Sequence, residues 1–439
     1  MSARICVVGT GYVGMACTIG LASLGWHVVG HDIQAERIER LKRGITPYRE
    51  QGIEEALRAH LASGLVSFDD SLESVTRDAE VIIIAVGTPS RDDGSADLAA
   101  LDAAILQLSK LNLKSFPTIV IRSTVPPGTC DRVALETQDW AAVVCAPEFL
   151  REGSAVADFL NPDRIVVGTE SAAAALPYVR LFEKLQKPVV FTSRCNAELI
   201  KSCSNAFLAL KISFANEVAN LCDATGAVAD DVLRGIGYDR RIGRDFLAPG
   251  IGFGGPCFDK DVRSMNHVAM QMNTGSQLFA ATLRTNDAQP KRIVSMLEAA
   301  CLELDGSEIG VWGLAFKAGT DDLRDSLALV ILDELSRRGA KTIVFDPAVH
   351  VAPLPAGSRL AATALEAAEA DALIVLTEWP EFAQIDPSIV KARLRNAIVI
   401  DGRNVLDADR YRAEGFFYHG IGRPHAVRES EPSVSTAII

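Results

Sequence analysis

A glycine pattern near the start of the chain constrains the fold more than any other feature of the sequence. Residues 9–14 read GTGYVG and directly follow the short apolar run 4–8. Residues 15–24 have the small and apolar side chains of a buried helix, residues 26–30 read as a second strand, and Asp32 follows that strand. A strand, a G-x-G-x-x-G turn, a helix and a second strand that ends at a carboxylate are typical of a dinucleotide-binding α/β fold.

The positions of this pattern have separate physical roles. Gly9 makes the tight turn, Gly11 lets a pyrophosphate approach the backbone, and Gly14 lets the helix pack closely on the strand. The helix N-terminus then points its free N–H groups at the phosphates, so the turn, Val13 included, is predicted to bind the cofactor. Asp32 is predicted to accept hydrogen bonds from the adenosine ribose and to repel a 2′-phosphate, which favours NAD over NADP.

Two further apolar runs, 80–86 and 117–122, predict strands that are buried on both faces. Ligands of parallel α/β sheets bind at the carboxyl ends of strands, so Thr88, Ser123 and Thr124 are predicted to hydrogen-bond a cofactor or substrate. The alternative for each is a helix cap or a turn residue. Arg37 could stack on adenine or bind phosphate, but taken alone it is better interpreted as a solvated helix charge.

Two carboxylates follow the next predicted strand, residues 141–146. Glu148 and Glu152 are four residues apart and would share one face of a turn or helix. Beside a ligand, one of them could act as a base while its neighbour raises its pKa. The alternative is the solvated start of a helix.

Residues 196–226 contain no glycine or proline before the final Gly226, and their apolar side chains recur at helical spacing. This pattern predicts a long helix that links two halves of the chain. Lys201 and Asn205 lie one turn apart on this helix, and a lysine there could stabilise an oxyanion or relay a proton. Taken alone, each is better interpreted as a surface residue.

The segment 250–261, GIGFGGPCFDKD, combines four glycines with a possible nucleophile. Cys257 is followed by Lys260 and Asp261, which would be its proton-transfer partners. A helix predicted at 261–274 would place the thiol before a helix N-terminus, where the dipole lowers a thiol pKa. The alternative is a flexible loop with a chance cysteine.

The last third of the chain predicts a second α/β unit that lacks the glycine pattern. Lys317 and Arg403 would contact the phosphates or sugar of a nucleotide that binds there differently, and a purely structural domain is the alternative. Residues 426–439 are predicted to be a disordered tail. The predicted strands of this unit include 341–345, 371–376 and 397–400.

Composition excludes several classes of protein. The 439 residues carry 44 basic and 56 acidic side chains, and a net charge of −12 argues against a nucleic-acid binder. The nine cysteines are odd in number and form no C-x-x-C pair, which argues against a disulfide framework or a metal site and favours a reducing cytoplasm. We expect no signal peptide and no membrane span, since no apolar run reaches about 18 residues.

Together these motifs resemble the UDP-glucose/GDP-mannose dehydrogenase family of nucleotide-sugar 6-dehydrogenases, over about residues 3–423. The resemblance implies two Rossmann-like doubly wound parallel-sheet domains joined by a long central helix. It divides the chain into an NAD-binding domain at 1–195, a helical connector and dimerisation region at 196–300, and a UDP-sugar domain at 301–425. The motifs that carry it are residues 9–14, 86–89, 123–126, 147–153, 161–164, 201 with 205, 250–261, 313–324 and 401–404.

The resemblance implies that a sugar C6 alcohol is oxidised to a carboxylate by two NAD+, through a thiohemiacetal and a thioester on Cys257 that water hydrolyses. Lys201 and Asn205 would stabilise oxyanions, and Asp261 would serve in acid/base steps. Glu148 and Thr124 would position water. Implied cofactor contacts are Gly9, Gly11, Val13, Gly14, Asp32, Arg37, Thr88, Thr124, Glu152, Lys260 and Arg324.

The implied substrate is UDP-glucose, bound by an enzyme that is a homodimer or a larger homo-oligomer, and Arg241 resembles an arginine that reaches the substrate of a partner subunit. GDP-mannose is the next choice, N-acetylated UDP-sugars are less favoured, and a non-catalytic nucleotide-sugar-binding protein is the alternative of another class. Implied substrate contacts are Glu148, Phe149, Leu150, Arg151, Glu152, Lys201, Asn205, Arg241, Phe246, Leu247, Ala248, Pro249, Gly250, Gly254, Lys317 and Arg403.

The segment around the nucleophile departs from the family's pattern at two positions. Pro256 stands where serine is usual, and it fixes φ and removes an N–H. Asp259 stands where proline or an uncharged residue is common, and its carboxylate would raise the thiol pKa or pair with Lys260. We expect activity to survive both departures.

Overall fold

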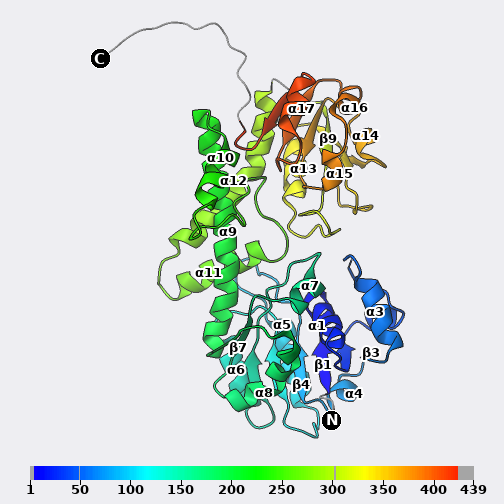
Figure 1. The fold of residues 1–439 in the computed structure, drawn as a ribbon, viewed down its shortest axis with the longest axis vertical. Helices are drawn as coiled ribbons and strands as arrows, with labels where there is room; N and C mark the ends of the chain where they lie inside the picture. Colours follow the sequence, from blue (N-terminus) through cyan, green and yellow to red (C-terminus); the bar gives the residue numbers. More distant parts are fainter. Residues whose placement is uncertain (1–3, 49, 301–302, 424–439) are drawn as a thin grey trace. The chain divides into compact units, whose positions relative to one another are not determined.

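The computed structural model describes residues 4–48, 50–300 and 303–423, so the predicted tail at 426–439 lies outside the described residues. The chain divides into two compact units (Figure 1). The first unit holds residues 1–208, 256–280 and 319–321, and the second holds residues 209–255, 281–318 and 322–439.

The first unit contains an eight-stranded sheet in the order β3-β2-β1-β4-β5-β6-β7-β8. All neighbouring strands are parallel except β6 and β7, which are antiparallel. The strands are β1 (Ile5–Val8), β2 (Val28–His31), β3 (Val66–Phe68), β4 (Val81–Ile84), β5 (Thr118–Ile121), β6 (Ala142–Cys145), β7 (Ile165–Gly168) and β8 (Val189–Thr192).

Strand β1 shows why this sheet is buried on both faces. Ile5 and Val7 belong to one hydrophobic cluster, and Cys6 and Val8 belong to another. Successive side chains of a strand point to opposite faces, so a continuous apolar run serves both clusters. The helices of this unit are α1 (Tyr12–Ser23), α2 (Ala35–Lys42), α3 (Ile53–Ala62), α4 (Leu72–Thr76), α5 (Ala99–Ser109), α6 (Thr129–Thr137), α7 (Ala155–Leu160), α8 (Ala172–Val179), the 3-10 helix η1 (Arg180–Leu185) and α11 (Phe258–Gln271).

The second unit contains a six-stranded parallel sheet in the order β11-β10-β9-β12-β13-β14. The strands are β9 (Glu308–Trp312), β10 (Lys341–Phe345), β11 (Arg359–Leu360), β12 (Ala372–Val375), β13 (Ile398–Asp401) and β14 (Phe417–Gly420). Its helices are α10 (Ala229–Gly237), most of α12 (Gln277–Ala299), α13 (Leu327–Arg337), α14 (Ala364–Ala367), α15 (Pro380–Ala383), α16 (Pro387–Lys391) and α17 (Ala408–Ala413).

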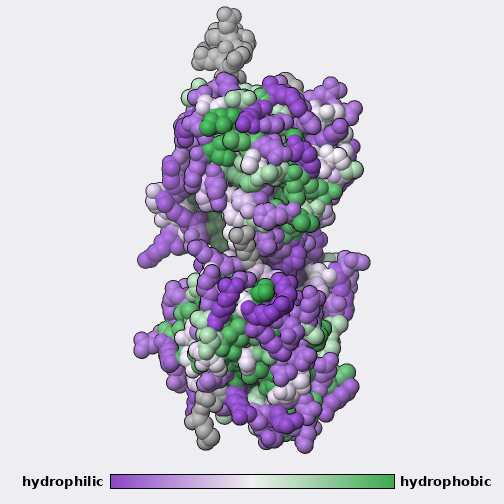
Figure 2. Space-filling model, turned by 90° about the vertical axis from the view of Figure 1, so that its right-hand side faces the viewer, coloured by the Kyte–Doolittle hydropathy of each residue, from purple (hydrophilic) through white to green (hydrophobic). Residues whose placement is uncertain are grey.

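The helix α9 (Arg194–Thr225) is 32 residues long and begins in the first unit and ends in the second (Figure 1). The predicted fold class, two parallel-sheet α/β domains joined by a long helix, is therefore confirmed. On the face shown in Figure 2, hydrophilic residues predominate and hydrophobic residues lie in small groups within each unit. Among the described residues, none of the helices combines the length and the apolar character needed to span a bilayer.

Candidate active site and nucleotide sites

The glycine turn between β1 and α1 has the geometry that a dinucleotide requires. Gly9 adopts φ +93°, and a Cβ there would lie 2.6 Å from the carbonyl oxygen of Ala85. A Cβ on Gly14 would lie 1.8 Å from the carbonyl oxygen of Gly9, so the helix packs on the turn as closely as glycine permits. A Cβ on Gly11 would meet nothing within 4 Å. The open side of the turn is thus where a pyrophosphate can approach the backbone.

Asp32 follows β2 and is held next to this turn. Its Oδ2 accepts hydrogen bonds from the backbone N–H of Thr10 at 2.9 Å and from the Thr10 hydroxyl at 2.8 Å. Arg37 donates to the same oxygen at 2.9 Å, while Oδ1 accepts from the backbone of Gln34 at 3.1 Å. Burial opposes ionisation, but the donated hydrogen bonds outweigh it and lower the pKa of Asp32. The interpretation of Arg37 as a solvated charge is wrong, because its guanidinium pairs with Asp32.

The carboxyl ends of β4 and β5 are joined by two side-chain hydroxyls, those of Thr88 and Ser123. The Thr88 hydroxyl donates to the carbonyl oxygen of Thr124 at 2.7 Å, and the Ser123 hydroxyl donates to the carbonyl oxygen of Val86 at 2.6 Å. Thr88 is thus a turn-stabilising residue in this structure, which was its alternative interpretation. Its oxygen keeps lone pairs that can accept a hydrogen bond from a ligand.

Cys257 is the N-cap residue of α11, which begins at Phe258 and not at Asp261 as predicted. The residue is accessible to solvent, but the protein atoms around the thiol remove much of its hydration. That desolvation raises the thiol pKa to about 12; Lys201 opposes the rise, and Glu148, Asp261 and Glu152 add to it. The prediction that the helix dipole lowers this pKa is therefore wrong, since desolvation and three carboxylates outweigh one helix end.

Lys201 and Glu148 form a buried ion pair, with Nζ and Oε1 2.9 Å apart and side-chain exposures of 5% and 8%. The interpretation of Lys201 as a surface residue is wrong. Desolvation penalises both charges, but their mutual attraction prevails, so the pKa of Lys201 is raised and the pKa of Glu148 is lowered. The free protein therefore carries an ammonium ion whose field acts on the Cys257 thiol.

Asn205 and Asp261 form the second polar pair of this site, and both are buried. Asn205 Nδ2 donates to Asp261 Oδ2 at 2.6 Å, and Lys260 Nζ donates to Asp261 Oδ1 at 2.6 Å. The sequence had suggested that Asp259 could pair with Lys260, but its carboxylate forms an ion pair with another residue. It pairs with Arg263, whose Nε lies 2.5 Å from Oδ2.

The segment that carries Glu148 and Glu152 is a loop and not a helix. The Leu150 backbone donates to Glu148 Oε2 at 2.5 Å, which fixes the carboxylate that holds Lys201. The Phe149 ring lies 5.5 Å from Lys201 Nζ and 3.9 Å from the Arg164 guanidinium carbon. Arg151 is largely exposed and pairs with Asp158 at 2.7 Å, so its predicted substrate contact would have to compete with that ion pair.

Two residues outside the predicted set support this loop. Arg122 is buried at the end of β5, and its Nη1 donates to the carbonyl oxygens of Ala146 and Pro147 at 3.1 and 3.3 Å. The hydroxyl of Tyr12, in the glycine turn, accepts from the backbone N–H of Gly153 at 3.1 Å. A lone arginine at a strand end was the sequence signal for the first contact, while nothing local signals the second.

In the second unit, the turn after β9 is stabilised by hydrogen bonds to a carboxylate of the same unit. Gly313 adopts φ +99°, as Gly9 does in the first unit. The backbone N–H groups of Leu314 and Ala315 donate to Asp346 Oδ2 at 2.8 and 3.0 Å, and Trp379 Nε1 donates to it at 3.1 Å. The carboxylate that follows β10 therefore accepts hydrogen bonds from two N–H groups of this turn, as Asp32 accepts one from the Thr10 N–H in the first unit.

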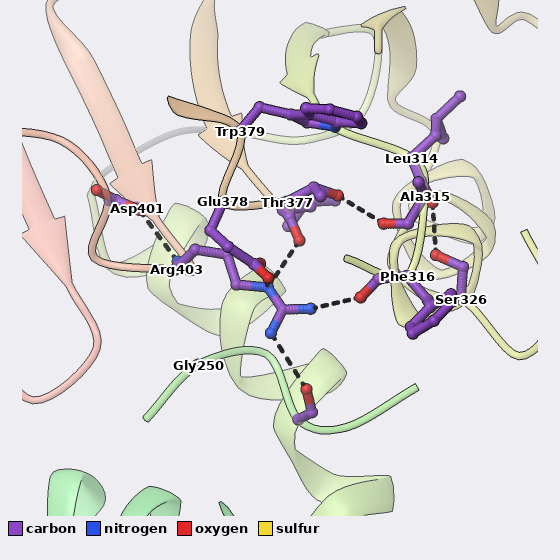
Figure 3. Close-up of polar contacts among 12 residues, drawn as sticks. Gly250, Leu314, Ala315, Phe316, Ser326, Thr377, Glu378, Trp379, Asp401 and Arg403 are labelled. Atoms are coloured by element: carbon purple, nitrogen blue, oxygen red, sulfur yellow. Dashed lines mark hydrogen bonds and ion pairs between the residues drawn. The ribbon is translucent and has the colours of Figure 1, made fainter. Parts of the chain in front are cut away.

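Arg403 cross-links three segments of the second unit (Figure 3). Its Nε donates to the carbonyl oxygen of Leu376 at 2.9 Å, its Nη1 to that of Gly252 at 3.4 Å, and its Nη2 to that of Phe316 at 3.3 Å. Glu378 lies 3.3 Å from Nε. Most of the guanidinium is thus engaged with the protein, and Arg403 positions the segment 250–252 beside the segment that carries Lys317.

The predicted substrate loop 246–250 adjoins a cavity of about 350 Å³ in the same unit. Phe246 adopts φ +62°, a strained conformation for an aromatic residue that is common at ligand sites. Arg324 and Arg241 are exposed and pair with Asp322 and Asp239 respectively. The cavity is lined by Asp230, Leu233, Arg234, Arg244, Leu247, Ala248, Pro249, Arg403, Asn404 and Arg423.

Comparisons with known proteins match this architecture along the chain. Residues 3–186 match the NAD binding domain of the UDP-glucose/GDP-mannose dehydrogenase family, residues 195–288 its central domain, and residues 310–408 its UDP binding domain.

Individual relatives agree. The chain is 41% identical to a UDP-glucose 6-dehydrogenase of Rhizobium meliloti, over 96% of this chain and 100% of the relative. A solved UDP-glucose dehydrogenase of Pyrobaculum islandicum has a TM-score of 0.89 at 36% identity, over 96% and 98% of the two chains. A GDP-mannose dehydrogenase of Pseudomonas aeruginosa has a TM-score of 0.54 at 26% identity, over 95% and 99%. The chain belongs to the UDP-glucose/GDP-mannose dehydrogenase family.

Proposed function

We propose that this protein is a UDP-glucose 6-dehydrogenase, which oxidises UDP-glucose to UDP-glucuronate with two NAD+. The observation that carries this proposal is the placement of Cys257 in the unit that holds the glycine turn, with Lys201–Glu148 and Asn205–Asp261 as its charged and polar surroundings. The names of the relatives support the choice of UDP-glucose.

The fit of NAD rests on features of the first unit. The open side of Gly11, the N-terminus of α1, whose N-cap Gly11 makes no side-chain cap hydrogen bond, and the carboxylate of Asp32 match a pyrophosphate and an adenosine ribose. When bound, NAD+ accepts one hydride at each of two oxidation steps. Thr88, Thr124, Glu152, Lys260 and Arg324 remain proposed contacts of the cofactor.

In the first oxidation, C6 of the sugar loses a hydride and its hydroxyl loses a proton, which leaves an aldehyde. Asp261, ordered by Asn205 and Lys260, is the proposed acceptor of that proton, through water. The Lys201 ammonium, which its ion pair keeps charged, stabilises the developing oxyanion.

Cys257 then adds to the aldehyde. The S–H bond and the carbonyl π bond break, a C–S bond forms, and the proton goes to oxygen, which gives a thiohemiacetal. Because the thiol pKa is raised, the free protein presents a protonated thiol, and this addition needs no net proton transfer to solvent. In the second oxidation, the carbon loses a hydride and the hydroxyl loses a proton, and the product is a thioester.

Hydrolysis completes the cycle. Water attacks the thioester carbon, the C–S bond breaks, and Cys257 regains its proton while the product leaves as a carboxylate. Glu148 and Thr124 are the proposed residues that position this water, Glu148 because its carboxylate is fixed by Leu150 and Lys201. The net reaction consumes the alcohol, two NAD+ and one water, and it releases two NADH, the carboxylate and three protons.

The nucleotide part of the substrate is assigned to the second unit. Lys317, Arg403, Gly254 and the loop 246–250 are its proposed contacts, and the arginines around the cavity supply positive potential for a diphosphate. GDP-mannose remains the second candidate, since the family includes enzymes for both sugars.

We further propose a homodimer, in which Arg241 reaches the partner's substrate. Helix α9 supports it: Phe207, Phe214 and Leu221 are spaced seven residues apart and are 61%, 48% and 63% exposed. Large apolar side chains at this spacing form one face of a helix, which a second copy can cover. All eight cysteines that the described ranges include are free, which fits our proposal of a cytoplasmic enzyme.

A substrate panel tests the activity. The protein with NAD+ is offered UDP-glucose, GDP-mannose and UDP-N-acetylglucosamine, and NADH is followed by absorbance. NADH with UDP-glucose supports the proposal, NADH only with GDP-mannose supports the second candidate, and nucleotide-sugar binding without NADH shows a non-catalytic protein. Cys257→Ser serves as the mechanistic variant, with Cys203→Ser, another exposed thiol, as its matched control. A Cys257→Ser protein that released uronate at the unaltered rate would contradict the thioester mechanism.

A further inference from the structure

The side-chain amide of Asn286 forms two hydrogen bonds with the glycine segment, residues 250–253, that precedes Cys257. Asn286, on α12, accepts a hydrogen bond from the backbone N–H of Phe253 at 2.7 Å and donates to the carbonyl oxygen of Phe253 at 3.0 Å. One amide thus satisfies both backbone groups of one residue, in the way that a neighbouring strand would. Asn286 and Phe253 are both buried, so these bonds are shielded from water.

Three residues earlier, both backbone groups of Gly250 are also hydrogen-bonded, here by two different side chains. Its backbone N–H donates to Asn216 Oδ1 at 2.7 Å, and its carbonyl oxygen accepts from Gln289 Nε2 at 3.0 Å. Asn220 in turn donates to Gln289 Oε1 at 3.2 Å, which fixes the orientation of that amide. Gln289 and Asn286 lie on α12, and Asn216 and Asn220 lie on α9.

Gly252 lies between the two held residues and shows how closely the amide approaches. It adopts φ +109°, and a Cβ there would lie 2.6 Å from Asn286 Oδ1. The Asn286 amide can therefore approach the backbone this closely because residue 252 is a glycine. A glycine-rich segment loses more backbone entropy on ordering than any other, so without these bonds the segment would sample many conformations.

We propose that Asn286 and Gln289 are positioning residues for the substrate: they hold the segment 250–253 in its binding conformation before the nucleotide sugar arrives. This inference rests on the proposed function, which assigns Gly250 and the loop before it to the substrate. Preorganisation removes an ordering cost from binding, so the amides act on substrate affinity through the backbone and not by contact.

The test compares the variants Asn286→Leu and Gln289→Met with Ser213→Ala. Ser213 also joins α9 to α12, through a buried hydrogen bond to the Thr282 carbonyl at 3.0 Å, and this bond does not involve residues 250–253. UDP affinity is measured by calorimetry, KM is measured separately for UDP-glucose and NAD+, and backbone exchange at 250–253 is followed by hydrogen–deuterium exchange.

We expect the Kd of UDP and the KM of UDP-glucose to rise about tenfold or more in Asn286→Leu. Both should rise less in Gln289→Met, which loses one hydrogen bond to the glycine segment where Asn286→Leu loses two, and the KM of NAD+ should stay unchanged in both variants. Exchange at 250–253 should become faster, and Ser213→Ala should change none of these values. If Asn286→Leu does not fold, Gln289→Met decides alone.

Two results separate the ways of failing. Folded variants that bind UDP as the unaltered protein does, or that lose UDP and NAD+ affinity together, overturn the positioning role while the proposed function stands. An unaltered protein that binds no UDP overturns the proposed function, and this inference with it.

Discussion

At the scale of single residues, the charge next to the proposed nucleophile, Cys257, is balanced within about one helix turn. Asp259 lies two residues from Cys257, but it pairs with Arg263 four residues further along α11. After desolvation, the groups that act most on the thiol pKa are Lys201, Glu148, Asp261 and Glu152. The departure from the family's pattern at this position thus carries its own neutralising cation.

This balance predicts different effects of two neutralising changes. Asp259→Asn leaves the Arg263 cation uncompensated and should not slow alkylation of Cys257, whereas Arg263→Ala leaves the carboxylate uncompensated and should slow it at pH 9 by about twofold to threefold. Alkylation is measured by mass spectrometry of the Cys257 peptide, with the Cys203 peptide as internal reference. Equal rates in Arg263→Ala and the unaltered protein would show that this ion pair does not act on the thiol.

The Lys201–Glu148 pair predicts how stability depends on pH. The pKa of Glu148 is lowered on folding, so its contribution is present above its ordinary value of 4.5 and is lost as pH falls. The pKa of Lys201 is raised, so its contribution is present below 10.5 and is lost as pH rises beyond it.

Lys201→Met should therefore lower the free energy of unfolding by about 3 kcal/mol at pH 7, because it leaves a buried carboxylate without its cation. The loss should shrink towards pH 5, where the stranded carboxylate takes up a proton, and the double variant with Glu148→Gln should be more stable than Lys201→Met alone. Urea unfolding at both pH values measures this. A loss that is equal at both values and is not relieved by the second substitution would contradict the buried pair.

At the scale of elements, two glycines of the turn between β1 and α1 have different roles. Gly14 allows α1 to pack closely on the turn, whereas Gly11 is proposed to leave room for NAD+. Gly14→Ala would place a Cβ 1.8 Å from the Gly9 carbonyl oxygen, while Gly11→Ala meets no protein atom within 4 Å. We expect Gly14→Ala to cost about 1–3 kcal/mol of stability. Gly11→Ala should keep the Tm of the unaltered protein and weaken NAD+ binding, as measured by fluorescence titration. A large fall in Tm for Gly11→Ala, or unchanged NAD+ affinity, would contradict the assignment of the turn.

At this scale, the sequence predicts an element well when the pattern that indicates it lies within a few consecutive residues. Strands buried on both faces, such as β1 and β4, appear in the sequence as continuous apolar runs. Helix α9 appears as apolar residues that recur at helical spacing without a glycine or proline between them. The helix start at Phe258 was missed because its N-cap residue, Cys257, is not a preferred cap type. The Asp259–Arg263 pair was visible as an i, i+4 pattern and was not used.

Long-range contacts leave no such signal. Lys201 and Glu148 are 53 positions apart, and nothing near Lys201 in the sequence distinguishes a buried lysine from a surface one. The same holds for Arg122 beneath the Glu148 loop and for Asn286 beside Phe253. The raised pKa of Cys257 depends on groups from three segments, so the helix N-terminus alone predicted the wrong direction.

At the scale of the whole molecule, the α9 face predicts assembly. Phe214→Glu would place a charge on the proposed interface, and we expect it to convert a dimer to a monomer in analytical ultracentrifugation. Leu135→Glu is the matched control, because Leu135 is 70% exposed and lies on a different helix, α6. Dissociation by both variants, or by neither, would argue against this face as the interface.

We propose that one active site carries UDP-glucose through two oxidations while Cys257 holds the intermediate. The most direct measurement is the number of NADH formed per UDP-glucose when the sugar is limiting and NAD+ is in excess, with the products identified by mass spectrometry. The account predicts two NADH and one UDP-glucuronate for each UDP-glucose, and no uronate at a comparable rate from Cys257→Ser. One NADH with a free aldehyde as product, or no NADH from UDP-glucose, would contradict it.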